Sequence, residues 1–266
     1  MNIIEDCRRD REDLARVLKK HTGIRKIVED LYPDSAHFIY ELLQNAEDAG
    51  ATETKFTLTK NCLAFEHNGR PFDSRDIFAI TDIGEGTKAH DEDKIGRFGI
   101  GFKAVFAYTE SPRIWSPTFA FKITELVLPS PLPPKPDQGK ETRFEFPFNN
   151  LKKSAPNAFS EVEEGLSDLS ETTLLFLSNI ESIAWDVPGK NKGMVRRILH
   201  SRHHIEVVKQ IEEKTTANTH FLRFTKPVEG LERQHIAIAF ALDALPKSKG
   251  FESGRALSEQ FRIVPA

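Results

Sequence analysis

The stretch from Phe38 to Ala49 constrains the fold of this chain more than any other. Three polar residues, Glu41, Asn45 and Asp48, follow one another along one edge of a helix built from it. Carboxylate and amide oxygens there could take a proton from water or bind a divalent cation. Beside that edge, an apolar stripe at spacings of three and four predicts a helix packed on a core: Phe38, Ile39, Leu42, Leu43, Ala46 and Ala49.

A second informative stretch is rich in glycine and precedes the apolar residues 104–107. Its glycines let the backbone approach a ligand closely, and a helix starting after them adds unpaired N–H groups and a positive dipole end. This construction favours phosphate binding, although a plain glycine-rich turn is the alternative. It lacks the Lys-Ser/Thr end of a P-loop, and no strand precedes it as in a dinucleotide fingerprint. The stretch reads Gly96-Arg97-Phe98-Gly99-Ile100-Gly101-Phe102-Lys103.

Composition narrows the class of protein. The 266 residues are 39% hydrophobic and 29% charged, which is typical of a globular chain, and the net charge of −3 gives no overall attraction to nucleic acid or anionic membranes. The longest apolar run, Ile236 to Leu242, is too short to span a bilayer. Cys7 and Cys62 lack metal-type spacing, which argues against a disulfide framework. We therefore expect a cytoplasmic protein, with a nuclear location also open.

Periodicity and turn residues predict the elements along the chain. Helices are expected at 9–20, 24–31, 74–81 and 158–169, and loops at 83–94 and 129–136. Strands are expected at 55–60, 62–67, 113–115, 119–127, 142–146, 173–177, 205–208, 220–224 and 236–242. We place a domain boundary near residue 180, which separates domain 1–180 from a β-rich segment 181–266. Since no closing element follows the last strand, we expect the front part of a longer protein.

Together these motifs resemble a known family. Glu41-x-x-x-Asn45-Ala46-x-Asp48-Ala49, then Asn68-Gly69, then Gly96-x-x-Gly99-x-Gly101-Phe102 resemble the ATP site of the GHKL superfamily of gyrase, the ninety-kilodalton heat-shock chaperones, histidine kinases and MutL. The forms around residues 67–72 and 95–106 look most like its sacsin-type, chaperone-like branch. The resemblance implies an α/β two-layer sandwich of the Bergerat type with a mixed sheet, followed by the smaller β segment.

By that resemblance the ligands are ATP and Mg²⁺. Asn45 would hold the Mg²⁺, and Glu41 would orient and deprotonate the attacking water. Backbone amides of the glycine-rich stretch would cradle the phosphates under a lid at 83–94. Lys88 and Lys103 are either phosphate partners or solvated surface cations. The residues expected at the nucleotide are Glu41, Asn45, Asp48, His67, Asn68, Gly69, Lys88, Gly96, Arg97, Phe98, Gly99, Ile100, Gly101, Phe102, Lys103 and Thr142.

The adenine end departs from the family pattern. The family usually has an aspartate that accepts a hydrogen bond from the adenine amine, whereas this chain has His67-Asn68-Gly69. A neutral His67 nitrogen or the Asn68 oxygen could accept that bond without a carboxylate's charge. Thr142 matches a family threonine near adenine, but Glu141 stands where a glycine is usual.

Residues 190–209 carry a basic tract with histidines interspersed. Nucleic-acid binding is one interpretation, but a solvated face is favoured because few aromatic residues are interleaved for stacking. The pair His203 and His204 is not expected to bind metal, since no cysteine or carboxylate stands at a suitable spacing.

Two functions follow from the resemblance. The favoured one is a slow ATPase whose nucleotide state acts as a conformational switch, with an ATP-dependent homodimer as a possible assembly and no membrane contact. The alternative is a module that holds the nucleotide without hydrolysis and gates a partner or a C-terminal region. A histidine kinase is less favoured, because His21 has no long coiled coil around it.

Overall fold

The structure, a computed structural model, describes residues 3–20, 23, 36–83, 101–136, 139–228, 231–244 and 261–263. Its helices are α1 (Ile3–Lys20), α3 (Phe38–Asp48), α4 (Ser74–Thr81) and α5 (Ala155–Ser167), with 3-10 helices η2 (Gly101–Ala107) and η3 (Glu171–Leu174). Its strands are β1 (Glu53–Thr59), β2 (Cys62–His67), β3 (Arg113–Trp115), β4 (Ala120–Thr124), β5 (Leu128–Pro131), β6 (Thr142–Pro147), β7 (Ser182–Val187), β8 (Asn191–Leu199), β9 (His204–Ile211), β10 (Lys214–Val228), β11 (Leu231–Ala244) and β12 (Phe261–Ile263). None of the described helices is both long and apolar enough to cross a membrane.

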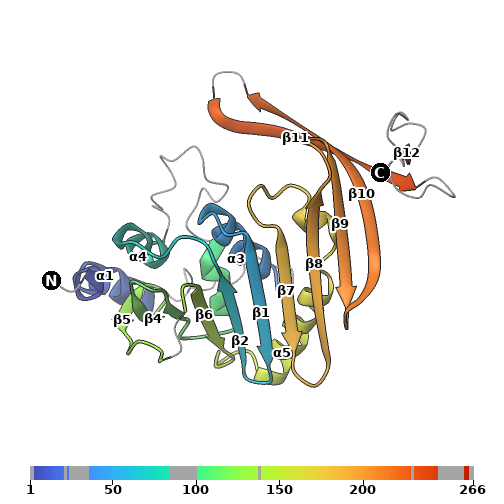
Figure 1. Ribbon diagram of the computed structural model, residues 1–266. Coiled ribbons are helices and arrows are strands. Elements are labelled where there is room, and N and C mark those ends of the chain that lie inside the picture. The colour runs from blue at the N-terminus through green and yellow to red at the C-terminus, as the bar shows by residue number, and fades with distance from the viewer. Residues whose placement is uncertain are drawn as a thin grey trace.

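These strands form one 12-stranded sheet in the order β12-β11-β10-β9-β8-β7-β1-β2-β6-β3-β4-β5 (Figure 1). Strand β7 runs parallel to β1, and the other described pairings are antiparallel. The protein is therefore an α/β structure with a large mixed sheet, as predicted. The parallel pair places β7 beside β1, so the sheet continues across residue 180, where the sequence suggested a boundary. The independence of 1–180 and 181–266 stays a prediction.

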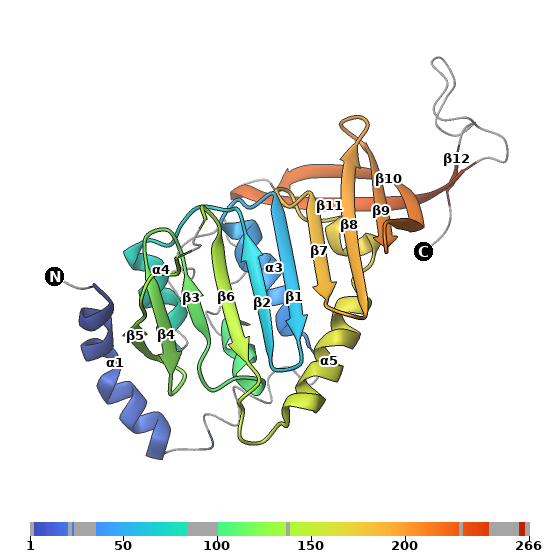
Figure 2. The same cartoon turned by 60° about the horizontal axis from the view of Figure 1, so that its bottom comes forward.

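Helices α3 and α5 lie against one face of the central strands (Figure 2). Five of the six apolar residues predicted to form the stripe of α3 are buried, and Ala49 is half-buried. They pack on apolar side chains of β1, β2 and β6 in one core. Helix α5 packs closely on the start of α3, because a Cβ built on Gly165 would lie 2.6 Å from the Cβ of Ala36.

Most predicted elements within the described residues are confirmed, two are corrected, and some strands were not predicted. The predicted strand 173–177 is wrong: its first two residues belong to the 3-10 helix η3, where the Ser170 N–H donates to Thr173 Oγ1. The predicted proline-rich loop begins instead as edge strand β5, where proline's missing N–H is tolerated. Strands β7 and β8 are both absent from the strands predicted from the sequence, and β8 occupies much of the basic tract. The predicted helix 24–31 and nearly all of the lid 83–94 lie outside the described residues.

Candidate functional site

The polar edge of α3 forms the centre of the candidate site. Glu41, Asn45 and Asp48 are all partly exposed, while the neighbouring stripe is buried. The Glu41 side chain keeps 17% of its exposure, and its Oε1 lies 3.9 Å from Nε2 of His37, one turn earlier. The helix therefore presents three oxygen-bearing side chains at a border between core and solvent, as predicted. His37 was not singled out from the sequence, although its spacing of four residues from Glu41 could have indicated the contact.

Gly101 lies directly against the first of these side chains. A Cβ built on Gly101 would come within 1.8 Å of Glu41 Oε2, so any larger residue would displace the carboxylate or the backbone. Glycine therefore lets the backbone approach the carboxylate in its present position, and a larger residue would make the Glu41 side chain move. The contact joins two stretches that are far apart in the sequence, the acidic helix and the end of the glycine-rich segment.

The turn after β2 lies against the other end of α3. The Arg70 N–H donates to the Ala49 carbonyl oxygen over 2.8 Å. A Cβ built on Gly69 would lie 2.8 Å from the same oxygen, so only glycine allows the turn to come so close. From Glu41 to Ala49 the helix rises about 12 Å. One face of α3 therefore has a glycine backbone packed at each end, with Asn45 and Asp48 between them.

His67 is buried at the end of β2, where burial keeps its ring neutral and a neighbouring N–H sets its tautomer. The Gly69 N–H donates to its Nδ1 over 3.1 Å. Burial, with a smaller contribution from the positive charge of Arg70, lowers the pKa of His67 to about 4, so the ring is neutral near pH 7. Since Nδ1 accepts a hydrogen bond, the proton of the neutral ring is on Nε2. At that nitrogen His67 is a hydrogen-bond donor, not the acceptor considered from the sequence.

Asn68 is committed to the structure of the turn. Its Oδ1 accepts from the N–H groups of Thr52 and Glu53, over 2.9 and 3.0 Å, and its Nδ2 donates to Thr52 Oγ1. These bonds tie the end of β2 to the start of β1 and occupy the oxygen expected to read a base. Thr142 does lie next to His67, since the two residues are paired across β2 and β6, and it is fully buried.

Lys103 is buried and held by the main chain. Its ammonium donates to the carbonyl oxygens of Ile80 and Leu126, over 2.6 and 2.7 Å. Burial lowers the pKa of Lys103 to about 7. The interpretation of Lys103 as a solvated surface cation is wrong, because the residue has no exposed area. These contacts also argue against a phosphate role, and Lys103 instead connects α4 to the turn before β5.

Of the remaining predicted residues, the structure describes Phe102. Phe102 is buried, with its ring 6.1 and 6.3 Å from the rings of Phe144 and Phe146, so its side chain anchors η2 in the core. The others lie outside the described residues: Lys88, Gly96, Arg97, Phe98, Gly99 and Ile100.

The structure also shows a polar network that the sequence reading missed. Glu47 is buried on the far side of α3, and its carboxylate accepts from the backbone N–H groups of residues 178–180, over 2.7 to 2.9 Å. Arg197 of β8 and Arg223 of β10 donate to carbonyl oxygens of residues 174–178 in the same segment. In the sequence, the only signal of this network is the position of Glu47 next to the apolar stripe of the helix.

The basic tract does not form one uniform surface. Lys190 pairs with Glu163, and Lys209 donates to the Ser167 carbonyl oxygen. Arg197 is buried in the network described above. These three cations hold secondary-structure elements together, and buried Arg197 does not belong to the solvated face favoured from the sequence. Nucleic-acid binding by the tract stays a prediction.

Comparison with known proteins shows which families and relatives this chain resembles. Residues 19–125, which include α3, the turn after β2 and η2, match the family described as the Sacsin domain. Protein NO VEIN of Arabidopsis thaliana is 27% identical over an alignment of 286 residues, which covers 92% of this chain and 10% of that protein. Sacsin of Homo sapiens is 38% identical over 102 residues, covering 32% of this chain and 2% of that protein. The chain spans a tenth or less of these relatives, and its matched segment is sacsin-like.

Among solved structures, the crystal structure of the N-terminal domain of a DNA repair protein aligns with a TM-score of 0.44 and 13% identity. The alignment covers 70% of this chain and 69% of that one.

Proposed function

We propose that this chain binds Mg²⁺–ATP along the polar edge of α3, hydrolyses it slowly, and uses the nucleotide state as a conformational switch. The proposed architecture is the Bergerat-type sandwich of the GHKL superfamily, with α3 and α5 forming the helical layer. The observation that carries the proposal is the contact between Gly101 and the Glu41 carboxylate. It brings the end of the glycine-rich stretch to the acidic helix, in the arrangement that the family resemblance implies.

The residues present fit such a ligand. Gly69 and Gly101 bring the main chain directly against the two ends of the helix edge, so backbone groups and the polar side chains of α3 lie side by side. Asn45 and Asp48 offer hard oxygen atoms between these ends, the ligand type that Mg²⁺ prefers. Bound Mg²⁺ would neutralise phosphate charge, and Asn45 would be its protein ligand. Phosphate oxygens would accept from the backbone N–H groups of the segment that ends at Gly101.

Glu41 has the chemistry of a general base. Its carboxylate is partly exposed at the core border, so a water molecule can approach it while Gly101 restricts its position. In the proposed reaction Glu41 orients a water molecule and accepts its proton as the water attacks the terminal phosphate. A positioned base of this kind contributes about 10² to 10⁴ in rate, equivalent to roughly 3 to 5 kcal/mol of barrier.

Calorimetry and single-turnover hydrolysis with labelled ATP test the proposal on the chain itself. Asn45→Ala is expected to lose most Mg²⁺–ATP affinity. Glu41→Ala is expected to keep affinity within a few-fold and lose about 10² to 10⁴ in hydrolysis rate. Glu164→Ala, which removes an exposed carboxylate on α5, is the matched control and should retain both properties.

The outcomes separate the two proposed functions. Binding without hydrolysis above the Glu41→Ala background would leave the non-hydrolysing, nucleotide-gated module as the function. Unchanged affinity in Asn45→Ala would remove that residue from the site. A shift toward dimer on adding ATP to Glu41→Ala, measured by size-exclusion chromatography, would support ATP-dependent assembly.

A further inference from the structure

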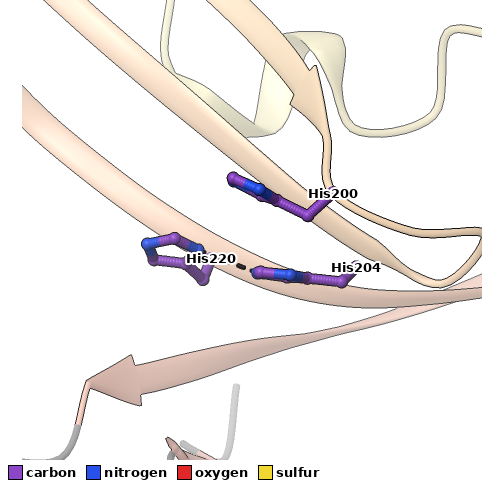
Figure 3. A group of neighbouring side chains, drawn as sticks. All are labelled: His200, His204 and His220. Atoms are coloured by element: carbon purple, nitrogen blue, oxygen red, sulfur yellow. Dashed lines mark hydrogen bonds between the residues drawn. The ribbon is translucent and has the colours of Figure 1, made fainter. Parts of the chain in front are cut away.

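Three histidines from different segments meet on the sheet far from α3. His200 follows β8, His204 begins β9, and His220 lies in β10 (Figure 3). The strand register explains the meeting: Leu199 pairs with Ile205, while His220 pairs with Glu206, two residues after His204. Side chains two residues apart in a strand share a face, so His204 and Glu206 point to the same side. The cluster was not predicted, because its members become neighbours only through pairing of β8, β9 and β10.

The distances within this cluster approach those of a metal site. One ligand nitrogen from each histidine lies within 4.8 Å of the other two. Nε2 of His204 and Nδ1 of His220 are 2.9 Å apart and share a hydrogen bond. Nitrogen ligands of a tetrahedral zinc ion lie about 3.3 Å apart, given Zn–N bonds of roughly 2.0–2.1 Å. The His200 and His204 rings are stacked, with centroids 4.6 Å apart, so a ring must turn for all three nitrogens to face one ion. His200 is the exposed member of the three, so its ring is the one that would turn.

Glu206 supports the three imidazoles. Its Oε2 is hydrogen-bonded to Nε2 of His200, and its Oε1 accepts from Nδ2 of Asn218 over 3.0 Å. A carboxylate bound to one nitrogen of a histidine is the usual outer partner of a metal-binding imidazole, since it fixes the tautomer and makes the other nitrogen a better ligand. In the proposed site, Nδ1 of His200 would therefore be the nitrogen that binds the ion.

The electrostatic setting favours neutral rings. Burial, followed by repulsion from His200 and His220, lowers the pKa of His204 to about 4. Burial also lowers the pKa of His220. Neutral imidazole is the form that binds metal. One of these two rings donates the proton of the hydrogen bond between them. On metal binding, that ring would change tautomer and carry its proton on its other nitrogen. The lone pairs of His204 Nε2 and His220 Nδ1 could then both face the ion, and both rings would stay neutral.

We propose that His200, His204 and His220 form a binding site for one zinc ion, with Glu206 orienting His200. Three imidazoles are a known zinc ligand set, and a fourth position would be left for water or Glu206. The ion would connect the end of β8 and the start of β9 to the middle of β10. His203 is not part of the proposed site, because its Nδ1 lies 3.1 Å from the Arg223 carbonyl oxygen and its ring stacks on Phe224.

Zinc titration of the tag-free, chelator-treated chain tests this proposal. We expect one Zn²⁺ per chain by calorimetry in competition with a chromophoric chelator, and a higher melting temperature in its presence. The double variant His200→Gln/His220→Gln should lose more than about 100-fold in affinity, whereas Glu206→Gln should lose about 10- to 100-fold. The matched control His203→Gln changes a neighbouring histidine outside the cluster and should bind zinc as the unaltered chain does.

Circular dichroism without metal checks that each variant is folded. If the double variant is unstable, His200→Gln alone serves, since the exposed position tolerates the change. The absence of stoichiometric zinc binding in the unaltered chain would overturn the proposal. So would equal losses in His203→Gln and the cluster variants, because that would indicate non-specific binding to surface histidines.

Discussion

Two parts of the same sheet differ in how their apolar residues are covered. Around β1, β2 and β6, the helix α3 buries Phe38, Leu42 and their neighbours almost completely. On β11, Ile236, Ile238 and Phe240 remain 60%, 54% and 43% exposed. Hydrogen bonding is continuous from one part to the other, yet among the described helices α3 and α5 cover one face of the first part. A continuous sheet can therefore be more stable in one part than in another. The reason is that burial of apolar surface, and not strand pairing, supplies most of the stabilising free energy.

The network around Glu47 joins these two parts. Residues 174–180 receive hydrogen bonds from Arg197 and Arg223 on one side and donate to Glu47 on the other. The segment that follows α5 is thus fixed between the central helix and the C-terminal strands. The predicted boundary near residue 180 falls within this junction.

Truncation of one apolar side chain in each part gives the largest expected contrast. Phe38→Ala should reduce the free energy of unfolding by about 3–5 kcal/mol, since it leaves a cavity in a fully packed core. Ile238→Ala should cost only about 0.5–1 kcal/mol, because more than half of the side chain is already exposed. Urea unfolding followed by circular dichroism measures both changes. Equal losses would show that β11 is covered in solution and would remove the contrast.

The fold could be predicted largely where one face of an element is buried. The stripe of α3 and the alternation in β2 gave both elements from the sequence, because a buried face imposes a period. The segment around η3 was misread, since its apolar residues pack individually without a repeat. Strand β8 was missed for the opposite reason: it carries charged residues such as Lys192 and Arg196 on an exposed face.

Loss of the Glu47 carboxylate is expected to have the next largest effect. Glu47→Ala should cost roughly 2–3 kcal/mol, because it leaves the buried Ile180 N–H without its acceptor and removes two partly buried bonds. Fluorescence of Trp185, on β7 beside the junction, should then change at lower urea concentration than the signal of Trp115 on β3, each recorded in a variant that lacks the other tryptophan.

Glu47→Gln keeps one acceptor oxygen and should show a smaller loss. If the two tryptophans of Glu47→Ala still report a single unfolding transition, the junction does not couple two separable parts. The boundary near residue 180 would then not separate parts that unfold independently.

The candidate site was predictable in its parts but not in its hydrogen bonds. Spacing placed Glu41, Asn45 and Asp48 on one helix edge, and the glycines indicated close backbone approach. The sequence could not show that Asn68 satisfies the start of β1, or that Lys103 is buried on carbonyl oxygens. Such roles depend on which backbone groups tertiary packing leaves unpaired.

Titration of His67 is expected to cause a third, smaller change in the free energy of unfolding. The pKa of His67 is about 4 in the folded chain and near 6.5 when unfolded, so between these values only the unfolded chain binds the proton. Stability therefore falls as the pH falls from 6.5 toward 4. Between pH 7.5 and 5.0 this residue should account for about 2 kcal/mol of lost unfolding free energy.

Urea unfolding at the two pH values, compared with His67→Asn, isolates the contribution. Asparagine can still accept the Gly69 N–H but does not titrate. His204 titrates in a similar range in both proteins and cancels in the comparison. The same loss in His67→Asn would mean that His67 is not responsible.

The smallest expected effect concerns the base of the nucleotide, and it rests on the proposed function. If His67 lies at the base, its Nε2 presents an N–H, whereas an aspartate there presents an acceptor. Inosine triphosphate, which differs from ATP by a carbonyl in place of the amine, should then bind more tightly than ATP. One hydrogen bond of about 0.5–1.5 kcal/mol corresponds to roughly 2- to 10-fold in affinity.

The variant His67→Asp reverses the polarity at this position and should restore a preference for ATP. Calorimetry with both nucleotides, on the unaltered chain and on this variant, measures the two ratios. Equal binding of both nucleotides to both proteins would show that His67 does not contact the base, while leaving nucleotide binding itself intact. Failure of either nucleotide to bind would count against the site along α3 instead. A preference for inosine triphosphate that reverses in His67→Asp would place the end of β2 at the base, because only a change from donor to acceptor accounts for such a reversal.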